Sequence, residues 1–164
     1  MQANVILRYH RSALAAVFVA VFAGSAIAQA PDPIIGVWKA NLAKSTYDPG
    51  PPAKSNTTKY EMVGDKVKVT VDSVQADGTT RHYESTSAYD GKDYPITGNS
   101  PYGDTVARTR TDARTVRSVT KKAGKVTATQ TSVMAADGKT RTVTTTGVNA
   151  AGQKVNNVVV YEKQ

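Results

Sequence analysis

Apolar and polar residues alternate with a period of two along much of the chain after residue 30. The pattern is clearest at residues 66–72, where Val67, Val69 and Val71 share one face and charged side chains occupy the other. Such alternation is typical of a half-buried β-strand. No stretch after residue 30 shows a sustained apolar repeat of about 3.6 residues. We therefore expect little or no helix in the mature chain.

Glycine, asparagine and aspartate divide this pattern at regular intervals, and they supply the positive φ angles that tight hairpin turns need. Each predicted strand is joined to the next by a short turn. This organisation predicts an all-β fold, an antiparallel up-and-down meander of about eight to ten strands that closes into a barrel. The predicted strands are residues 34–40, 57–63, 66–74, 79–89, 92–97, 104–110, 114–121, 125–134, 139–147 and 153–162.

Residues 41–54 interrupt the strand pattern. Pro49, Pro51 and Pro52 exclude a regular helix or a central strand there. We interpret the segment as an ordered, extended crossing that Tyr47 anchors. A different kind of repetition occurs at two turns, because Ala76-Asp77-Gly78-Thr79-Thr80-Arg81 recurs as residues 136–141, ADGKTR. Two independent uses of one favourable turn explain this better than a duplicated hairpin.

The N-terminus has the pattern of a secretory signal peptide. Arg8, His10 and Arg11 precede an apolar run, and small residues at 26 and 28 suit cleavage after Ala28. The alternative, an uncleaved anchor, would need about 20 predominantly apolar residues, and the clearly apolar run is shorter. We expect residues 1–28 to be the signal, residues 29–164 to be a single β-barrel domain, and the mature protein to be periplasmic or secreted without stable membrane insertion.

Charge and cysteine content narrow the possible functions. The full chain has 21 basic and 13 acidic residues. The basic residues after the signal are scattered in ones and twos, which indicates a solvated surface and no nucleic-acid partner. Because the chain has no cysteine, disulfides, thiol catalysis and thiolate metal sites are excluded. We expect a monomer.

Residues at both ends of the domain resemble the calycin group. Gly36-Val37-Trp38-Lys39 lies on the first predicted strand, and Tyr161-Glu162-Lys163 lies on the last. Lipocalins and fatty-acid-binding proteins carry a similar Gly-x-Trp near the start. The resemblance implies that Gly36, Trp38 and Lys163 form a barrel plug, with the lysine across the indole. A cation in that position contributes about 0.5–2 kcal/mol.

The fatty-acid-binding proteins are the more similar branch, since they also have ten strands and end in a similar Tyr-Glu-Lys. They insert a helical lid where this chain has its proline-rich crossing. They also read a carboxylate with an arginine two residues before the last-strand tyrosine, and this chain has Val159 there. The whole chain also resembles exported bacterial β-proteins.

Tyrosines and arginines are the candidates for an interior binding site. Arg108 and Arg110 lie two residues apart on one strand and so point to the same side. If they point inward, they demand an anionic or carbonyl ligand, because buried charges are not left unpaired. If they point outward, they serve solubility, which is the orientation we favour. The candidate ligand-binding residues are Tyr60, Tyr83, Tyr89, Tyr94, Tyr102, Arg108, Arg110 and Tyr161.

Catalysis has little support in the mature sequence. His82, its one histidine, shares a strand face with Glu84, so a proton relay is conceivable, but a solvated strand face explains the pair better. No catalytic motif, metal site or cofactor site is recognisable. We therefore expect a non-catalytic exported barrel that binds a small amphipathic or apolar molecule. The alternative is a filled barrel with a structural or protein-interaction role in the cell envelope.

Overall fold

Antiparallel strands make up the regular structure of residues 32–164, the part of the chain that the computed structural model describes. The signal peptide expected at residues 1–28 lies outside this range. The strands are β1 Gly36–Thr46, β2 Ser55–Val63, β3 Lys66–Val74, β4 Thr80–Ser87, β5 Asp90–Pro95, β6 Thr97–Gly98, β7 Thr105–Arg110, β8 Thr115–Lys122, β9 Lys125–Met134, β10 Thr140–Val148 and β11 Lys154–Lys163.

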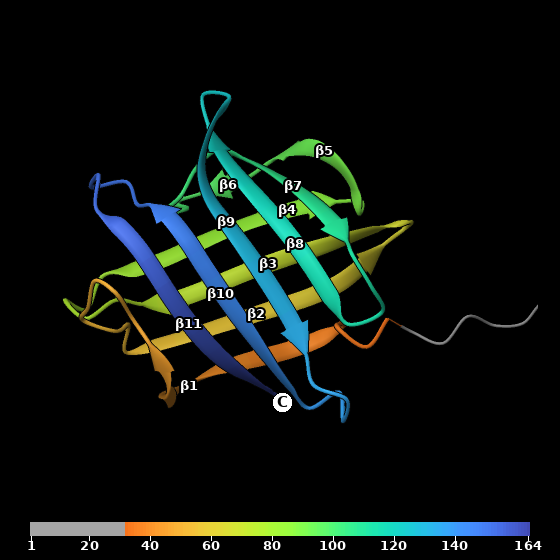
Figure 1. Ribbon diagram of the computed structural model, residues 1–164, viewed down its shortest axis with the longest axis horizontal. Coiled ribbons are helices and arrows are strands. Elements are labelled where there is room, and N and C mark those ends of the chain that lie inside the picture. The colour runs from red at the N-terminus through yellow and green to blue at the C-terminus, as the bar shows by residue number, and fades with distance from the viewer. Residues whose placement is uncertain (1–31) are drawn as a thin grey trace, which may run out of the picture. The chain divides into compact units, whose positions relative to one another are not determined.

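The eleven strands form one sheet that curls into a nearly closed barrel (Figure 1). Their order is β5-β7-β8-β9-β10-β11-β1-β2-β3-β4-β6. The first and last long strands pair, with Trp38 opposite Lys163 and Ala40 opposite Tyr161. A seam without ladder pairing remains between the β5–β7 edge and the β4–β6 edge. The predicted all-β meander, closed by its first and last strands, is confirmed.

The connections around the seam differ from a strict next-neighbour meander. β5 pairs with β7 and not with β4, while the two-residue β6 pairs with β4. The turn predicted at residues 90–91 therefore does not form a hairpin, and the chain crosses the seam there. Pro95 ends β5 at the sheet edge, where its missing N–H is not needed for a ladder.

The first strand is longer than the prediction, since β1 continues to Thr46 and only residues 47–54 form the irregular crossing. The register of β1 against β11 shifts between Asn41 and Thr46. Ser45 compensates for this bulge. Its hydroxyl accepts a hydrogen bond from the Val160 N–H at 3.0 Å and donates one to the Asn41 carbonyl at 2.6 Å. A side chain thus supplies the polar contacts that the interrupted ladder lacks.

The period-two alternation separates interior from exterior positions. Val67, Val69 and Val71 are buried, as predicted, and form one core cluster with aromatic residues packed against it. A second cluster surrounds Trp38 at the end of the barrel where β1 begins, and it includes Ile34 and Met134. We call this the closed end. Within residues 32–164, no helix is long and apolar enough to cross a bilayer.

Candidate functional site

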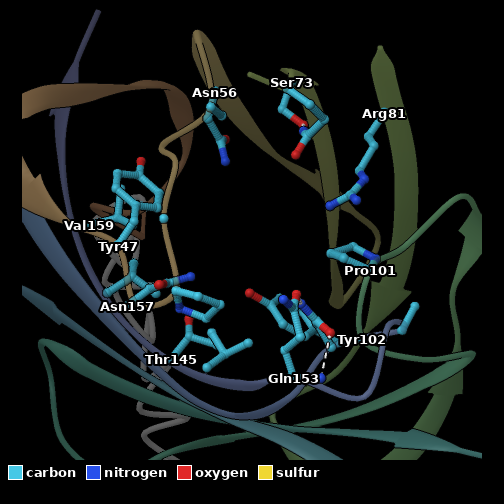
Figure 2. A pocket seen from close by; sticks show the side chains of 18 of the residues that line it. Tyr47, Asn56, Ser73, Arg81, Pro101, Tyr102, Thr145, Gln153, Asn157 and Val159 are labelled. Atoms are coloured by element: carbon cyan, nitrogen blue, oxygen red, sulfur yellow. Dashed lines mark hydrogen bonds between the residues drawn. The ribbon is translucent and has the colours of Figure 1, made fainter. Parts of the chain in front are cut away.

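A cavity of about 600 Å³ occupies the end of the barrel opposite Trp38, and we call this end the mouth (Figure 2). Strand ends supply part of its wall: Asn56 lies near the start of β2, Ser73 near the end of β3 and Arg81 near the start of β4. In Figure 2 the Arg81 guanidinium reaches into the space from one side, and Tyr47 faces it from the other. Amide side chains are unusually frequent in the lining: Asn56, Gln75, Gln130, Asn149, Gln153 and Asn157.

Three irregular segments form the rim of the mouth, residues 47–53, 101–102 and 149–153. Hydrogen bonds donated by backbone N–H groups hold these segments in place. The Asp48 N–H donates to Asn157 Oδ1 at 2.8 Å, and the Asn156 N–H donates to the Asp48 carbonyl at 2.7 Å. The Ala150 N–H donates to the Pro101 carbonyl at 2.9 Å. The proline-rich crossing is therefore tied to β11 and forms one wall of the mouth.

A second, smaller cavity of about 90 Å³ lies deeper in the barrel, towards Trp38. It is lined by Tyr60, Tyr89, Ser85, Arg108 and Arg141, among others. The two cavities are adjacent because five residues line both of them. These shared residues are Tyr83, Tyr102, Gln130, Val143 and Tyr161.

Arg108 enters the small cavity from β7 and is held by two serines of β4. Its Nη1 donates to Ser87 Oγ at 2.6 Å, and its Nη2 donates to Ser85 Oγ at 2.8 Å. Both serines are buried. Burial lowers the pKa of the Arg108 guanidinium, because desolvation disfavours its charged form.

Arg141 enters from β10 and is only 2% exposed. Its guanidinium carbon lies 4.3 Å from the ring centre of Tyr161, 4.8 Å from that of Tyr60 and 5.3 Å from that of Trp38. Its Nη1 donates to the Tyr60 hydroxyl at 2.8 Å. Its Nε is buried and has no hydrogen-bond partner within the described residues 32–164. Aromatic faces therefore stabilise this cation where a carboxylate would be usual.

Trp38 closes the barrel beneath these arginines. It is fully buried, and its Nε1–H donates to the Ile34 carbonyl at 2.7 Å. Lys163 Nζ lies 5.4 Å from its ring centre and donates to the Pro33 carbonyl at 2.8 Å. Gly36 has a φ of +127°, and a Cβ there would lie 3.0 Å from Lys163 Cε. A side chain at position 36 would therefore displace the lysine.

Burial also changes the acidity of the interior tyrosines. Desolvation raises the pKa of Tyr161 and of Tyr89 to about 12, and it raises the pKa of Tyr83 as well. The neutral phenol is the form that the barrel interior favours. At neutral pH these side chains present hydroxyl groups that can donate or accept a hydrogen bond.

Six of the eight sequence-based candidates reach a cavity. Tyr60, Tyr83, Tyr89, Tyr102, Arg108 and Tyr161 line the small cavity, and three of them also line the large one. Tyr94 lines neither. Its hydroxyl donates to Asp90 Oδ2 at 3.1 Å, and Lys66 Nζ lies 5.4 Å from its ring centre, because β5 sits at the edge of the sheet.

The outward orientation that we favoured for Arg108 and Arg110 is wrong. Both lie on the inner side of β7, the side that carries the buried Val106. Arg110 nevertheless lines neither cavity. It forms an ion pair with Asp32 and lies over the Tyr89 ring, 4.4 Å from its centre. The charge of Arg110 is therefore matched by a carboxylate, whereas that of Arg108 has no carboxylate partner among residues 32–164.

His82 and Glu84 lie on the outer face of β4 and bond to different partners. His82 Nδ1 is 2.7 Å from Asp72 Oδ1, and both side chains are more than half exposed. Glu84 pairs with Lys68 at 2.7 Å. Across residues 32–164, no group of three or more His, Asp or Glu side chains is arranged to hold a metal ion.

Sequence reasoning missed Arg81 and Arg141 as interior residues. The repeated turn contained a signal, because both arginines stand at the same position after Asp-Gly, in residues 76–81 and 136–141. The strand that follows each turn places that position on the inside. The two turns lie at opposite ends of the barrel, so one arginine reaches the mouth and the other reaches the closed end.

Comparisons with known proteins show a remote structural similarity, which carries no argument about this chain. No family model matches the chain, and no curated protein matches it. Among solved structures, the chain is similar to one described as "The Siderocalin Ex-FABP functions through dual ligand specificities". That similarity has 14% sequence identity and a TM-score of 0.37, and it covers 80% of this chain and 74% of the other. At this level of similarity, no ligand or site is transferred.

Proposed function

We propose that this barrel is an exported, non-catalytic binding protein that takes a small amphipathic molecule through its mouth. The observation that supports the proposal is the cavity of about 600 Å³. Small-molecule sites span about 300–1,000 Å³ and combine apolar walls with a few polar groups. The alternative is a structural or protein-interaction role for a barrel filled with its own side chains. A filled barrel would not leave such a space.

The lining favours an amphipathic ligand over a wholly apolar one. Tyrosine rings and the side chains of Val143, Val155 and Val159 offer apolar area, while amides and Arg81 offer hydrogen bonds. Asn56 Oδ1 is buried and finds no hydrogen-bond partner in the part of the chain that the structure describes. An acceptor left unpaired in this way costs about 1–3 kcal/mol.

Native mass spectrometry of the mature protein from its own host, and a thermal-shift screen, would test the proposal. The screen would use fatty acids, sterols, isoprenoids and aromatic acids. A ligand at about 100 times its dissociation constant adds about 2.7 kcal/mol of stability, which moves the unfolding midpoint of a domain this size by several degrees.

Two tryptophan substitutions form a matched pair: one blocks the mouth, and the other, at the closed end, is its control. Ala53 lines the large cavity from the crossing, and Ala136 lies exposed in the turn at the closed end. Ala53→Trp should abolish any ligand-induced shift, while Ala136→Trp should leave it unchanged. No copurifying molecule and no shift with any class of compound would contradict the proposal and favour the filled, structural barrel.

A further inference from the structure

The interior of the barrel holds positive charge without matching negative charge. Arg81 lines the large cavity, and Arg108 and Arg141 line the small one. Among residues 32–164, no aspartate or glutamate lines either cavity. The neighbouring Arg110 shows the usual solution, since it is paired with Asp32. Buried cations without such a partner carry an uncompensated desolvation cost.

The partners that Arg108 and Arg141 do have are neutral. Arg108 donates to the hydroxyls of Ser85 and Ser87, and Arg141 donates to the hydroxyl of Tyr60. Each hydroxyl that accepts such a bond keeps its own O–H to donate. The small cavity is therefore surrounded by hydrogen-bond donors: guanidinium N–H groups, the Ser85 and Tyr60 hydroxyls, and the unpartnered Nε–H of Arg141.

The size of the small cavity fits a headgroup and not a whole ligand. At about 90 Å³, it has room for a few water molecules of about 30 Å³ each or for one carboxylate. The larger cavity begins beyond the five residues that line both spaces. A molecule could therefore place its acidic end in the small cavity and its body in the large one.

We infer that the small cavity is an anion subsite that binds the carboxylate of the ligand, with Arg108 as its principal contact. The inference rests on the proposed function, because the body of the ligand must occupy the large cavity. Arg108 is the principal contact because it is held by two neutral serines alone, whereas Arg141 is also stacked on three aromatic rings. An anion would satisfy the donors and offset the buried positive charge.

Two matched series of ligands test the subsite by isothermal titration calorimetry. The first is phenylpropanoate, phenylpropanol and phenylpropylamine, and the second is decanoate, decanol and decylamine. Within a series, the body is constant and only the headgroup changes. We expect the carboxylate to bind most tightly in at least one series and the amine most weakly, because the amine brings a like charge to Arg108.

Substitutions of Arg108 then locate the effect. Arg108→Gln should weaken carboxylate binding about tenfold to a hundredfold, as expected for a lost charged hydrogen bond, and should leave the alcohol nearly unchanged. Arg108→Lys, which keeps the charge without the guanidinium fork, should fall between. Arg117→Gln removes the same charge from an exposed position on β8 and should change neither. Circular dichroism of each variant checks that it folds.

The outcomes separate the subsite from the binding function. If the alcohol binds as tightly as the carboxylate in both series, or if Arg108→Gln leaves carboxylate binding unchanged, the inference is wrong and the binding function stands. If no member of either series binds, the result counts against the binding function, and the subsite is rejected with it.

Discussion

The closed end and the mouth of this barrel are built from the same strands but from different side chains. At the closed end, Trp38 packs with Ile34 and Met134, and its one polar atom is hydrogen-bonded. At the mouth, amides and an arginine surround an open space, and Asn56 Oδ1 has no partner. β11 passes from Tyr161 at one end to Val155 at the other with the same alternation.

This difference indicates a division of roles along the barrel axis. The closed end buries apolar and aromatic area, which is the main source of folding free energy. Both ends contain an unsatisfied buried polar atom among residues 32–164, Arg141 Nε at the closed end and Asn56 Oδ1 at the mouth. The mouth differs because its amides and Arg81 surround an open space and bury less apolar area. Substitutions at the two ends should therefore differ in which quantity they change: the free energy of unfolding at the closed end and ligand affinity at the mouth.

The largest expected effect is the loss of the closed-end indole. Trp38→Ala should lower the free energy of unfolding by about 3–5 kcal/mol, because it removes a fully buried aromatic side chain and leaves a cavity. Urea denaturation followed by circular dichroism would measure the loss. A cost below about 1 kcal/mol would place Trp38 among ordinary surface positions and would remove the contrast between the two ends.

Alkaline pH should act on the buried phenols inside the barrel. The pKa of Tyr161 is raised to about 12 by burial, whereas an unfolded tyrosine titrates near 10. Between these values the unfolded state binds fewer protons than the folded state, so the free energy of unfolding falls as pH rises. This tyrosine alone contributes a loss of about 2–3 kcal/mol from pH 10 to 12.

Urea denaturation at several pH values, with tyrosinate absorbance as the titration readout, would measure this loss. The Tyr161→Phe variant has no phenol to ionise at this position, so it should lose less stability than the wild type between about pH 10 and 12. An equal pH dependence in wild type and variant would show that the Tyr161 phenol is not responsible. The stability below pH 10 should be insensitive to this titration.

The smallest expected stability effects lie at the mouth. Among residues 32–164, the acceptor that Asn56→Ala removes has no partner, and the cation that Arg81→Gln removes forms no ion pair. Neither should lower the free energy of unfolding by more than about 0.5 kcal/mol, and Asn56→Ala should raise it, because an unpaired buried acceptor costs stability. Both should weaken any ligand found in the screen. A mouth substitution as costly as Trp38→Ala would contradict the division of roles.

The fold was largely predictable from the sequence because its signals are local. The alternation at Val67, Val69 and Val71 and the turn glycines depend on neighbours in the chain. The seam was not predictable, because the pairing of β5 with β7 depends on which edge lies closer after the barrel curls. The bulge at Ser45 was also missed, since its hydroxyl bonds to Val160 on a strand far along the chain.

The site was predicted in part, for a related reason. Tyrosines are large and amphipathic and so stand out in a sequence, and most of the candidates do reach a cavity. The orientation of an arginine is different, because it depends on which face of its strand turns inward. Arg108 and Arg110 occur in a run of threonines and arginines in which neither face is apolar enough to identify the inside.

The position of Trp38 gives the protein a built-in optical reporter. It is the one tryptophan in the chain, and its ring centre lies 5.3 Å from the guanidinium carbon of Arg141, which lines the small cavity. The emission of an indole responds to the electric field of nearby charges. A ligand whose acid group reaches Arg141 should therefore change the emission wavelength, and one that stays at the mouth should not. Fluorescence of the unlabelled protein can report how deeply a ligand enters.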